Sequence, residues 1–476
     1  MKRIPHVAAV FFLLILFPLN SFSQLILQIG ERLQQAEMTK TTDMKNGEKT
    51  NDHLFSKKYT NYIFLLLFLL YMFDYLDRMV ISSLFPFLKA EWNLTDFQCG
   101  GLVSAVYASI VIFTFPVSVL IDRWSRKKTV GLMALIWGLA TALGAFTRSF
   151  RQLFSTRSLI GIGEAGYAPG GSAMISAMYP VEKRSWMLGL WNASIPLGSA
   201  MGVAIGGIIA THWGWRHALG IVSIPGIIIA LLFFFVKDYK TVGLMKKEPS
   251  GSGAMEPKLV RMSVMDVFGE FIHKPSLIFT YFGIAGVIFT TTSLMTWLPT
   301  YFIRVQGMQA SPAGVKSSAV MLLAIVGAPL GGFMVDRWRK RRINARLIFP
   351  AITTLISAVI MFFAFTVFAG QMQYLLLLSV GISITAFISA ASAVTQDVVH
   401  AGLRAISYAV AVVVQNLLGA FLAPIVMGAI SDATSIQTAF NLLPISLIIS
   451  SGLFFAGSFF YEKDLKKVVQ VKLEAV

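Results

Sequence analysis

Two stretches of the chain, SVLIDRWSRKK (residues 118–128) and GGFMVDRWRKRR (residues 331–342), follow one pattern. In each, an apolar run ends in Asp-Arg-Trp and continues into a cluster of basic residues. Their aspartates, Asp122 and Asp336, are 214 positions apart. Each copy follows the second of six apolar stretches, so we expect the chain to consist of two related halves.

The composition places both halves in a membrane. The chain has 476 residues, of which 56% are hydrophobic and only 13% are charged, whereas soluble domains carry about 25% charged residues. A membrane-spanning helix needs about 20 apolar residues, so this length accommodates a dozen spans with short loops. We therefore predict an all-α membrane protein with twelve transmembrane helices, in two six-helix halves around a central cavity. A compact soluble enzyme is excluded.

The apolar stretches define the predicted spans and domain boundaries. Six spans are expected in each half, at residues 60–86, 98–121, 129–147, 152–179, 186–211 and 217–236, then 275–303, 315–335, 347–369, 372–396, 404–430 and 437–460. The predicted domains are an N-terminal segment (1–59), a first bundle (60–236), a cytoplasmic linker rich in Pro, Gly, Ser and charge (237–274), a second bundle (275–461) and a tail (462–476).

The basic residues predict the orientation. The net charge of +17 is gathered in short clusters between apolar stretches, which is the positive-inside pattern of cytoplasmic loops. When Lys and Arg are counted in the segments on alternate sides of the predicted spans, most lie on the side of the two termini, which predicts that both termini are cytoplasmic. We expect the protein in the plasma (inner) membrane. Neither cluster lies in a nucleic-acid-binding module, so no nucleic acid is expected. The single cysteine, Cys99, excludes an internal disulfide.

Residues 1–37 resemble a signal peptide, with Lys2 and Arg3 before an apolar run. A spanning or cleaved segment would place the later basic clusters outside, against the charge rule. Two explanations stay open: the mature chain begins near Met38 or Met44, or this segment does not span. It is left out of the fold prediction.

The repeated loops resemble the major facilitator superfamily, whose signature is Gly-x-x-x-Asp-Arg-x-Gly-Arg-Lys. The matching positions are Asp122, Arg123, Arg126 and Lys127 in the first loop and Asp336, Arg337, Lys340 and Arg341 in the second. Within the superfamily, LDR (76–78), RSLIGIGEAGY (157–167) and NASIPLGSAMG (192–202) are most similar to spinster-like members, and next to the anion:cation symporter group. The resemblance implies alternating access, with the two loops as gates; a role as topology signals alone is the other interpretation.

Charged residues inside the predicted spans are the candidate functional site. Asp74, Asp77 and Arg78 lie at spacing i, i+3, i+4 in the first span, so one face of a helix is expected to present all three. Arg157 and Glu164 share a face of the fourth span. Such charges are costly in hydrocarbon and usually face a partner or a water-filled cavity.

The charges of this group add up to an excess of one negative charge, which one proton would neutralise. A carboxylate in a low-dielectric site can take up a proton, whereas arginine stays charged. The resemblance implies Asp77 as the proton carrier, with Arg157 and Glu164 as partners. A static salt-bridge cluster that fixes helix packing is the alternative, and Asp74 could lie at the rim of the cavity.

Small residues in two spans are better explained by packing. GIGEAG (161–166) has the Gly-x-Gly-x-x-Gly spacing but lies inside a span, without the strand that a dinucleotide site needs. The fifth span carries Gly198, Gly202, Gly206 and Gly207, which resemble an antiporter signature whose proline is replaced by Val203. Close helix packing explains both stretches as well, and GAPLGG (327–332) likewise.

The second half supplies neutral candidates for solute recognition. Hydrogen-bonding and aromatic side chains suit a solute cavity, and the candidates are Tyr281, Trp297, Gln415 and Asn416. For each of them, ordinary helix packing is the competing interpretation.

The predicted function is secondary active transport of a small organic solute, expected to be an organic anion, by alternating access coupled to protons. Arg78 and Arg157 could hold a carboxylate or phosphate. The alternatives are a spinster-like exporter of a lysolipid or sphingolipid-like amphiphile and, in another class, a membrane sensor that does not transport. No cofactor, metal or catalytic residue is predicted. The expected partners are the solute, protons and membrane lipids, around a monomer.

Overall fold

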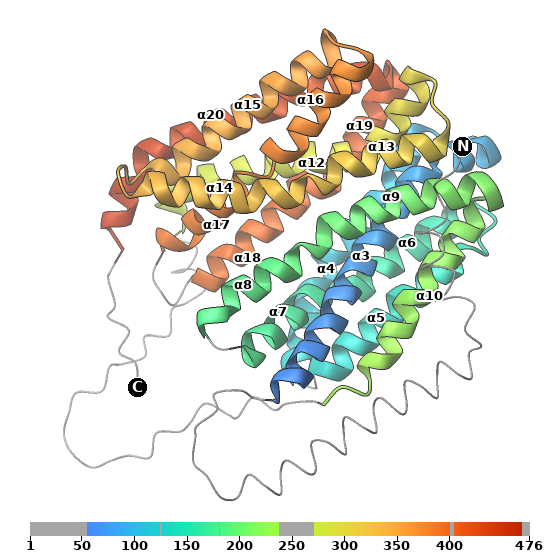
Figure 1. Ribbon diagram of the computed structural model, residues 1–476, viewed down its shortest axis with the longest axis horizontal. Helices are drawn as coiled ribbons and strands as arrows, with labels where there is room; N and C mark the ends of the chain where they lie inside the picture. The colour runs from blue at the N-terminus through green and yellow to red at the C-terminus, as the bar shows by residue number, and fades with distance from the viewer. Residues whose placement is uncertain (1–54, 124–125, 180, 238–270, 400–403, 469–476) are drawn as a thin grey trace, which may run out of the picture.

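The computed structural model describes residues 55–123, 126–179, 181–237, 271–399 and 404–468. These residues are almost entirely helical, and the described part of the chain contains no strand. The helices of the first half, labelled as in Figure 1, are α3 (Lys57–Trp92), α4 (Asp96–Arg123), α5 (Arg126–Gly144), α6 (Phe150–Glu164), α7 (Tyr167–Met178), α8 (Val181–Asn192), α9 (Ser194–Trp213) and α10 (Trp215–Phe233).

The second half has the same organisation. Its helices are α12 (Pro275–Gln306), α13 (Ala310–Leu322), α14 (Ala324–Arg339), α15 (Ala345–Thr366), α16 (Gly370–Ser383), α17 (Ile388–Asp397), α18 (Arg404–Val414), the π-helix η2 (Gln415–Phe421), α19 (Leu422–Ala433) and α20 (Ile436–Lys466). In the described residues, nine helices are long and apolar enough to cross a membrane.

Several predicted spans are helices broken near their middle. The predicted span 152–179 is divided between α6 and α7 at Ala165 and Gly166. The second helix begins at Tyr167, and Pro169 lies in its first turn, where no backbone N–H is needed. Similar breaks separate α8 from α9, α13 from α14, and α16 from α17. When these pairs are joined, and α18, η2 and α19 are taken as one continuous rod, the described helices form six rods in each half, which agrees with the predicted twelve-helix membrane fold.

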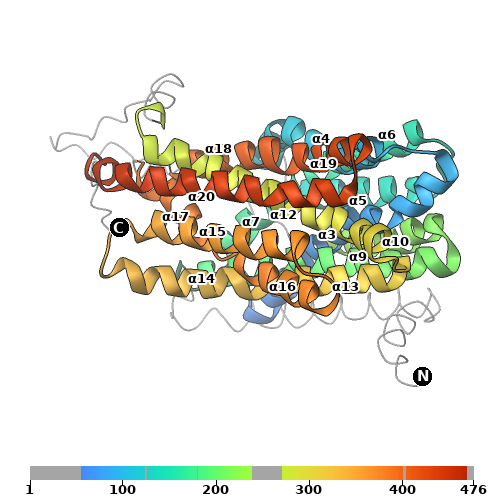
Figure 2. The same cartoon turned by 90° about the horizontal axis from the view of Figure 1, so that it is seen from above.

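The two groups of helices lie side by side (Figure 1) with their long axes roughly aligned (Figure 2). At one end they pack against each other through α4 with α19 and α9 with α13. At the other end a cavity opens between α8 and the pair α17 and α18. The molecule is therefore closed at one end and open at the other.

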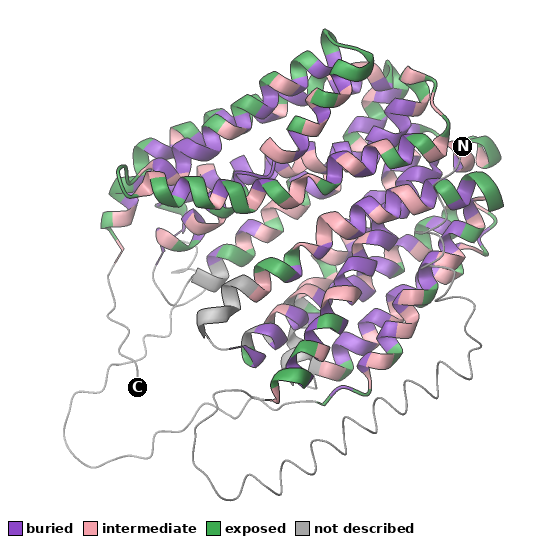
Figure 3. Cartoon of the chain, in the orientation of Figure 1, coloured by how far each residue is buried: buried purple, intermediate pink, exposed green. Residues whose placement is uncertain are grey.

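The surface of the bundle is apolar. Exposed residues cover the outer faces of the helices while buried residues fill the inside (Figure 3). Large hydrophobic side chains are exposed on α15 and α20, among them Phe362, Ile449 and Phe459. A soluble monomer rarely exposes such continuous apolar surface, whereas a helix in contact with lipid must.

Glycines bring helix backbones into direct contact, as expected from the sequence. A Cβ atom at Gly198 or Gly202 would lie 2.1 or 2.4 Å from the carbonyl oxygen of Met72 or Leu76, so α9 packs tightly on α3. In the second half, Gly327 and Gly331 of α14 meet the backbone before α17 in the same way. Gly189 on α8 has no neighbour within 4 Å, because it borders the cavity.

Parts of the sequence prediction lie outside the described residues. These are residues 1–37, most of the predicted linker (238–270) and the last eight residues (469–476).

Candidate functional site

The three charged residues of α3 are buried inside the first half. The exposed fractions of Asp74, Asp77 and Arg78 are 1%, 0% and 6%. Asp74 therefore does not lie at a cavity rim. The expected common face is only partly present: Asp74 and Arg78 are directed to α6, whereas Asp77 contacts α5. The single cluster predicted from the sequence is thus divided into two.

The first part is an ionic triad of Asp74, Arg78 and Glu164. Arg78 Nη2 lies 3.0 Å from Asp74 Oδ2 and 2.7 Å from Glu164 Oε2. Both carboxyl groups contact the same nitrogen, Arg78 Nη2. Asp74 Oδ1, Glu164 Oε1 and Arg78 Nε are buried without hydrogen-bond partners among the described residues. One guanidinium group therefore forms ion pairs with two carboxyl groups.

Aromatic rings cover the remaining surface of this guanidinium. The Cζ atom of Arg78 lies 4.4 Å from the ring centroid of Tyr75 and 5.2 Å from that of Tyr107 on α4. Such rings attract a cation through their negative faces, most strongly where water is excluded. They separate the triad from solvent, since Arg78 keeps only 6% of its surface exposed.

The second part is Asp77, which has neutral partners. Its Oδ2 accepts hydrogen bonds from Trp137 Nε1 at 2.8 Å and from Thr141 Oγ1 at 3.1 Å, both on α5. Its Oδ1 is buried without a partner among the described residues. The sequence analysis missed Trp137 and Thr141. Their spacing of i, i+4 within the third span was the available signal, since it places an indole N–H and a hydroxyl on one face.

Arg157 binds backbone carbonyls instead of a carboxylate. Its Nη1 and Nη2 donate to the carbonyl oxygens of Asp77 and Arg78 at 3.1 Å each, and its Nε donates to that of Leu102 at 3.3 Å. Among the described residues it forms no ion pair within 4.0 Å. The expected Asp77–Arg157 partnership therefore runs through the main chain, where Arg157 joins α3, α4 and α6.

The predicted gating loops are only partly described. The side chains of Asp122, Arg123 and Arg126 lie outside the described part, and Lys127 is half-buried. In the second loop, Asp336, Arg337, Lys340 and Arg341 are exposed at the end of α14. The ion pairs at this end involve residues that the sequence analysis did not select. Arg346 pairs with Asp397, and Arg339 Nη2 lies 3.9 Å from the same carboxylate.

The four predicted cavity residues have two different environments. Tyr281 and Trp297 are buried and bonded: Tyr281 Oη contacts Ser407, and Trp297 Nε1 donates to the carbonyl of Pro424. Gln415 and Asn416 begin the π-helix and are half-buried, and their amides make no hydrogen bond to another described residue. Short π-helical segments occur frequently at functional sites, which favours this second pair.

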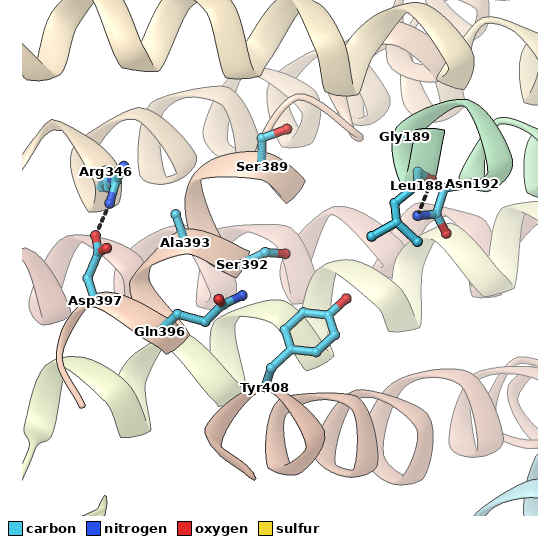
Figure 4. Close-up of a pocket in the computed structure, with 10 residues that line it drawn as sticks. All are labelled: Leu188, Gly189, Asn192, Arg346, Ser389, Ser392, Ala393, Gln396, Asp397 and Tyr408. Carbon is cyan, nitrogen blue, oxygen red and sulfur yellow. Dashed lines mark hydrogen bonds and ion pairs between the residues drawn. The ribbon is translucent and has the colours of Figure 1, made fainter. Parts of the chain in front are cut away.

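The cavity at the open end is polar and has a volume of about 630 Å³. Figure 4 shows Ser389, Ser392, Gln396 and Tyr408 directed into a space that Asn192 and Leu188 of α8 border from the other half. Arg346 also lines it and keeps a buried Nε–H without an acceptor among the described residues. Arg346 and Arg339 both lie near Asp397, and Asp336 also interacts with Arg346, so two arginines and two aspartates meet beside this wall.

At the closed end, residues of α4 and α19 form an inter-half contact that we name the closed gate. Asp96 at the start of α4 is bound by both Nη atoms of Arg304 at 2.6 Å, and by Lys89 and Ser431. In return, the carboxylate of Asp432 accepts the backbone N–H groups of Asp96 and Phe97 at 2.8 and 2.7 Å. The sequence analysis did not identify this contact.

Comparisons with known proteins agree with this geometry. The family profile described as Major Facilitator Superfamily matches residues 67–424. Among similar sequences, the hexuronate transporter of Bacillus subtilis is 26% identical over 310 residues, which cover 65% of this chain and 72% of that protein. Protein spinster homolog 1 of Xenopus tropicalis is 27% identical over 446 residues, which cover 85% of this chain and 82% of that protein. The probable sulfoacetate transporter of Cupriavidus necator is 28% identical over 298 residues, which cover 59% of this chain and 65% of that protein.

Solved structures show the same fold. A bacterial homolog of the human lysosomal transporter spinster, in an inward-facing and occupied conformation, superposes with a TM-score of 0.74 at 23% identity, covering 86% of this chain and 99% of that chain. A D-xylose–proton symporter superposes with a TM-score of 0.64 at 16% identity, covering 86% of this chain and 100% of that chain. The predicted resemblance, to spinster proteins first and anion transporters next, is confirmed at the level of the family.

Proposed function

This chain belongs to the major facilitator superfamily, and from that premise we propose that it is a secondary active transporter that moves a small organic anion across the membrane together with protons. Membership of the superfamily makes it a multi-pass membrane transporter and not an enzyme. The observation that carries the finer proposal is the buried group Asp74, Asp77, Arg78, Arg157 and Glu164, because its charge depends on bound protons.

Proton coupling requires a site whose protonation changes the relative energy of two conformations. Two carboxyl groups on one buried guanidinium, with a third carboxyl nearby, form such a site. A static cluster would need no excess of carboxyl groups over cations. The buried network also joins α3, α4 and α6, so a change in its charge acts on helices that border the interior.

The proposed cycle is alternating access between the two halves. The predicted topology assigns the open end to the cytoplasm, since α3 begins there and α10 leads there to the predicted linker. The present conformation is then inward-facing, and the closed gate seals the outer side. We propose the halves as the rigid units (60–236 and 275–461), a monomer in the plasma (inner) membrane, and gating by the loops at Asp122 and Asp336.

Three observations support an anionic solute. The cavity is lined by the ion pair of Arg346 and Asp397, in which the Arg346 Nε–H has no acceptor among the described residues, and by neutral hydrogen-bonding side chains. Gln415 and Asn416 of the π-helix carry amides that make no hydrogen bond to another described residue. Two relatives are named for anions, a hexuronate and sulfoacetate. We propose a carboxylate or sulfonate with further oxygen groups.

The second candidate is export of a lysolipid or sphingolipid-like amphiphile. Its support is the length of the spinster match, which covers 85% of this chain. The polar lining of the cavity does not favour it, because a lipid tail needs an apolar wall.

A thermal-shift screen of the purified protein tests both candidates. The probes are glucuronate, galacturonate, sulfoacetate and single-chain phospholipids, each measured below and above neutral pH. A bound ligand raises the apparent stability by RT ln(1 + [L]/Kd). Stabilisation by an organic acid, followed by its proton-driven accumulation in proteoliposomes, is the expected result. Stabilisation by single-chain lipids alone would contradict the anion proposal and support the amphiphile.

A further inference from the structure

The geometry points to one proton shared between the carboxyl groups of Asp74 and Glu164, with Arg78 as their common cation, as the coupling proton of the transporter. This inference rests on the proposed function and deepens it. It moves the proton from Asp77, the position implied by family resemblance, to a pair of carboxyl groups on α3 and α6.

The charge balance of the triad requires a proton. Asp74 and Glu164 are 1% and 4% exposed and both contact Arg78. If both were ionised, the triad would carry one uncompensated negative charge away from water, which is strongly unfavourable. A single proton cancels that charge. The carboxyl groups can also share it, since both contact the same nitrogen, Arg78 Nη2, at 3.0 and 2.7 Å.

The surrounding groups provide no other compensation. The groups that face the pair are Tyr71, Tyr75 and Asp77 of α3, Tyr107 of α4, Arg157 of α6 and Tyr167 of α7. The tyrosines are neutral when protonated. Arg157 is the remaining cation, and its three donating nitrogens are directed to backbone carbonyls. It interacts electrostatically with both Glu164 and Asp77, so the five charged groups together still carry one excess negative charge.

Asp77 is less suited than the Asp74–Glu164 pair to hold this proton. Its Oδ2 accepts hydrogen bonds from Trp137 Nε1 and Thr141 Oγ1, and such bonds favour the ionised carboxylate. A proton on Oδ1 would have no acceptor among the described residues. The exchangeable proton of these five groups is therefore held by the triad of Asp74, Arg78 and Glu164, where two carboxyl groups contact one guanidinium nitrogen. During transport the proton passes from the pair to water on the open side, and uptake from the other side restores it.

Infrared difference spectroscopy of the purified protein tests this assignment without a solute. A buried carboxylic acid gives a C=O stretch that carboxylates lack, and the expected result is one such band at neutral pH. Asp74→Asn and Glu164→Gln should each abolish it, because the remaining carboxylate is then balanced by Arg78 alone. The matched variant Asp77→Asn should keep it. Asp74→Glu, which retains the acid, should also keep it and serves as the check for folding.

The outcomes separate the proton site from the function. Loss of the band in Asp77→Asn, with its retention in Asp74→Asn, would overturn the assignment, and so would the absence of any such band in the unsubstituted protein. A band with the expected pattern in a protein that accumulates no solute would leave the proton site standing and contradict the proposed function. Proton-driven accumulation of a solute by a protein that lacks the band would support the proposed function and contradict the proton site.

Discussion

A methyl group at Gly100 should hold the closed gate open. Gly100 lies on α4 one turn after Asp96, where α4 meets α19. A Cβ atom there would lie 2.1 Å from the carbonyl oxygen of Pro424, which is backbone and cannot rotate away. The halves must separate to accept it. The adjacent Gly101 has no neighbour closer than 4.0 Å, so it provides a matched control.

The size of the effect follows from the cost of overpacking. An extra methyl group in a tightly packed contact costs about 1–3 kcal/mol, which changes a conformational equilibrium roughly 5- to 150-fold. The preference of alanine over glycine for helix, about 1 kcal/mol, is common to both variants and cancels in the comparison. Gly100→Ala should therefore raise the population with an open outer side by this factor relative to Gly101→Ala.

The only cysteine of the chain reports the opening. Cys99 is fully buried beside Gly100, and its electrostatic neighbours include Arg304 and Asp432 of the other half. Its labelling by a membrane-impermeant maleimide should accelerate in Gly100→Ala and not in Gly101→Ala. Hydrogen exchange in peptides of α19 should increase in parallel. Equal labelling rates in both folded variants would refute the assignment of this contact as a gate.

Three further changes test other contacts. Asp432→Ala removes the acceptor of two backbone N–H groups across the closed gate. The rate of Cys99 labelling should then rise about fivefold, for a loss of ~1 kcal/mol. The control Ser435→Ala removes a cap within α20 alone and should leave the labelling rate unchanged. Trp137→Phe deletes the indole donor to Asp77 and should lower the free energy of unfolding by about 1–3 kcal/mol, measured in denaturant; an unchanged value would contradict an ionised Asp77. Asn416→Ala should weaken binding of the stabilising acid about 2- to 10-fold in the thermal-shift assay without lowering the melting temperature of the unliganded protein; unaltered affinity would remove the π-helix from the solute site.

The membrane class, the duplicated plan and the charged residues of the spans could be predicted without coordinates. Hydropathy is a property of each segment taken alone, so twelve spans can be counted before any helix is packed. The cost of a charge in hydrocarbon is equally local, and it singled out Asp74, Asp77, Arg78, Arg157 and Glu164. The repeat at Asp122 and Asp336 needed only alignment of the chain with itself.

The pairing of those charges depends on how the helices pack and could not be predicted from their spacing. The spacing of Asp74, Asp77 and Arg78 suggested one face, but the rotation and crossing of α3, α5 and α6 direct them to different partners. Those angles are set by packing, as where Gly198 seats α9 on the backbone of α3. The closed gate joins Asp96 to Asp432, 336 residues away. Such a contact depends on the relative position of the two halves, which no local pattern encodes.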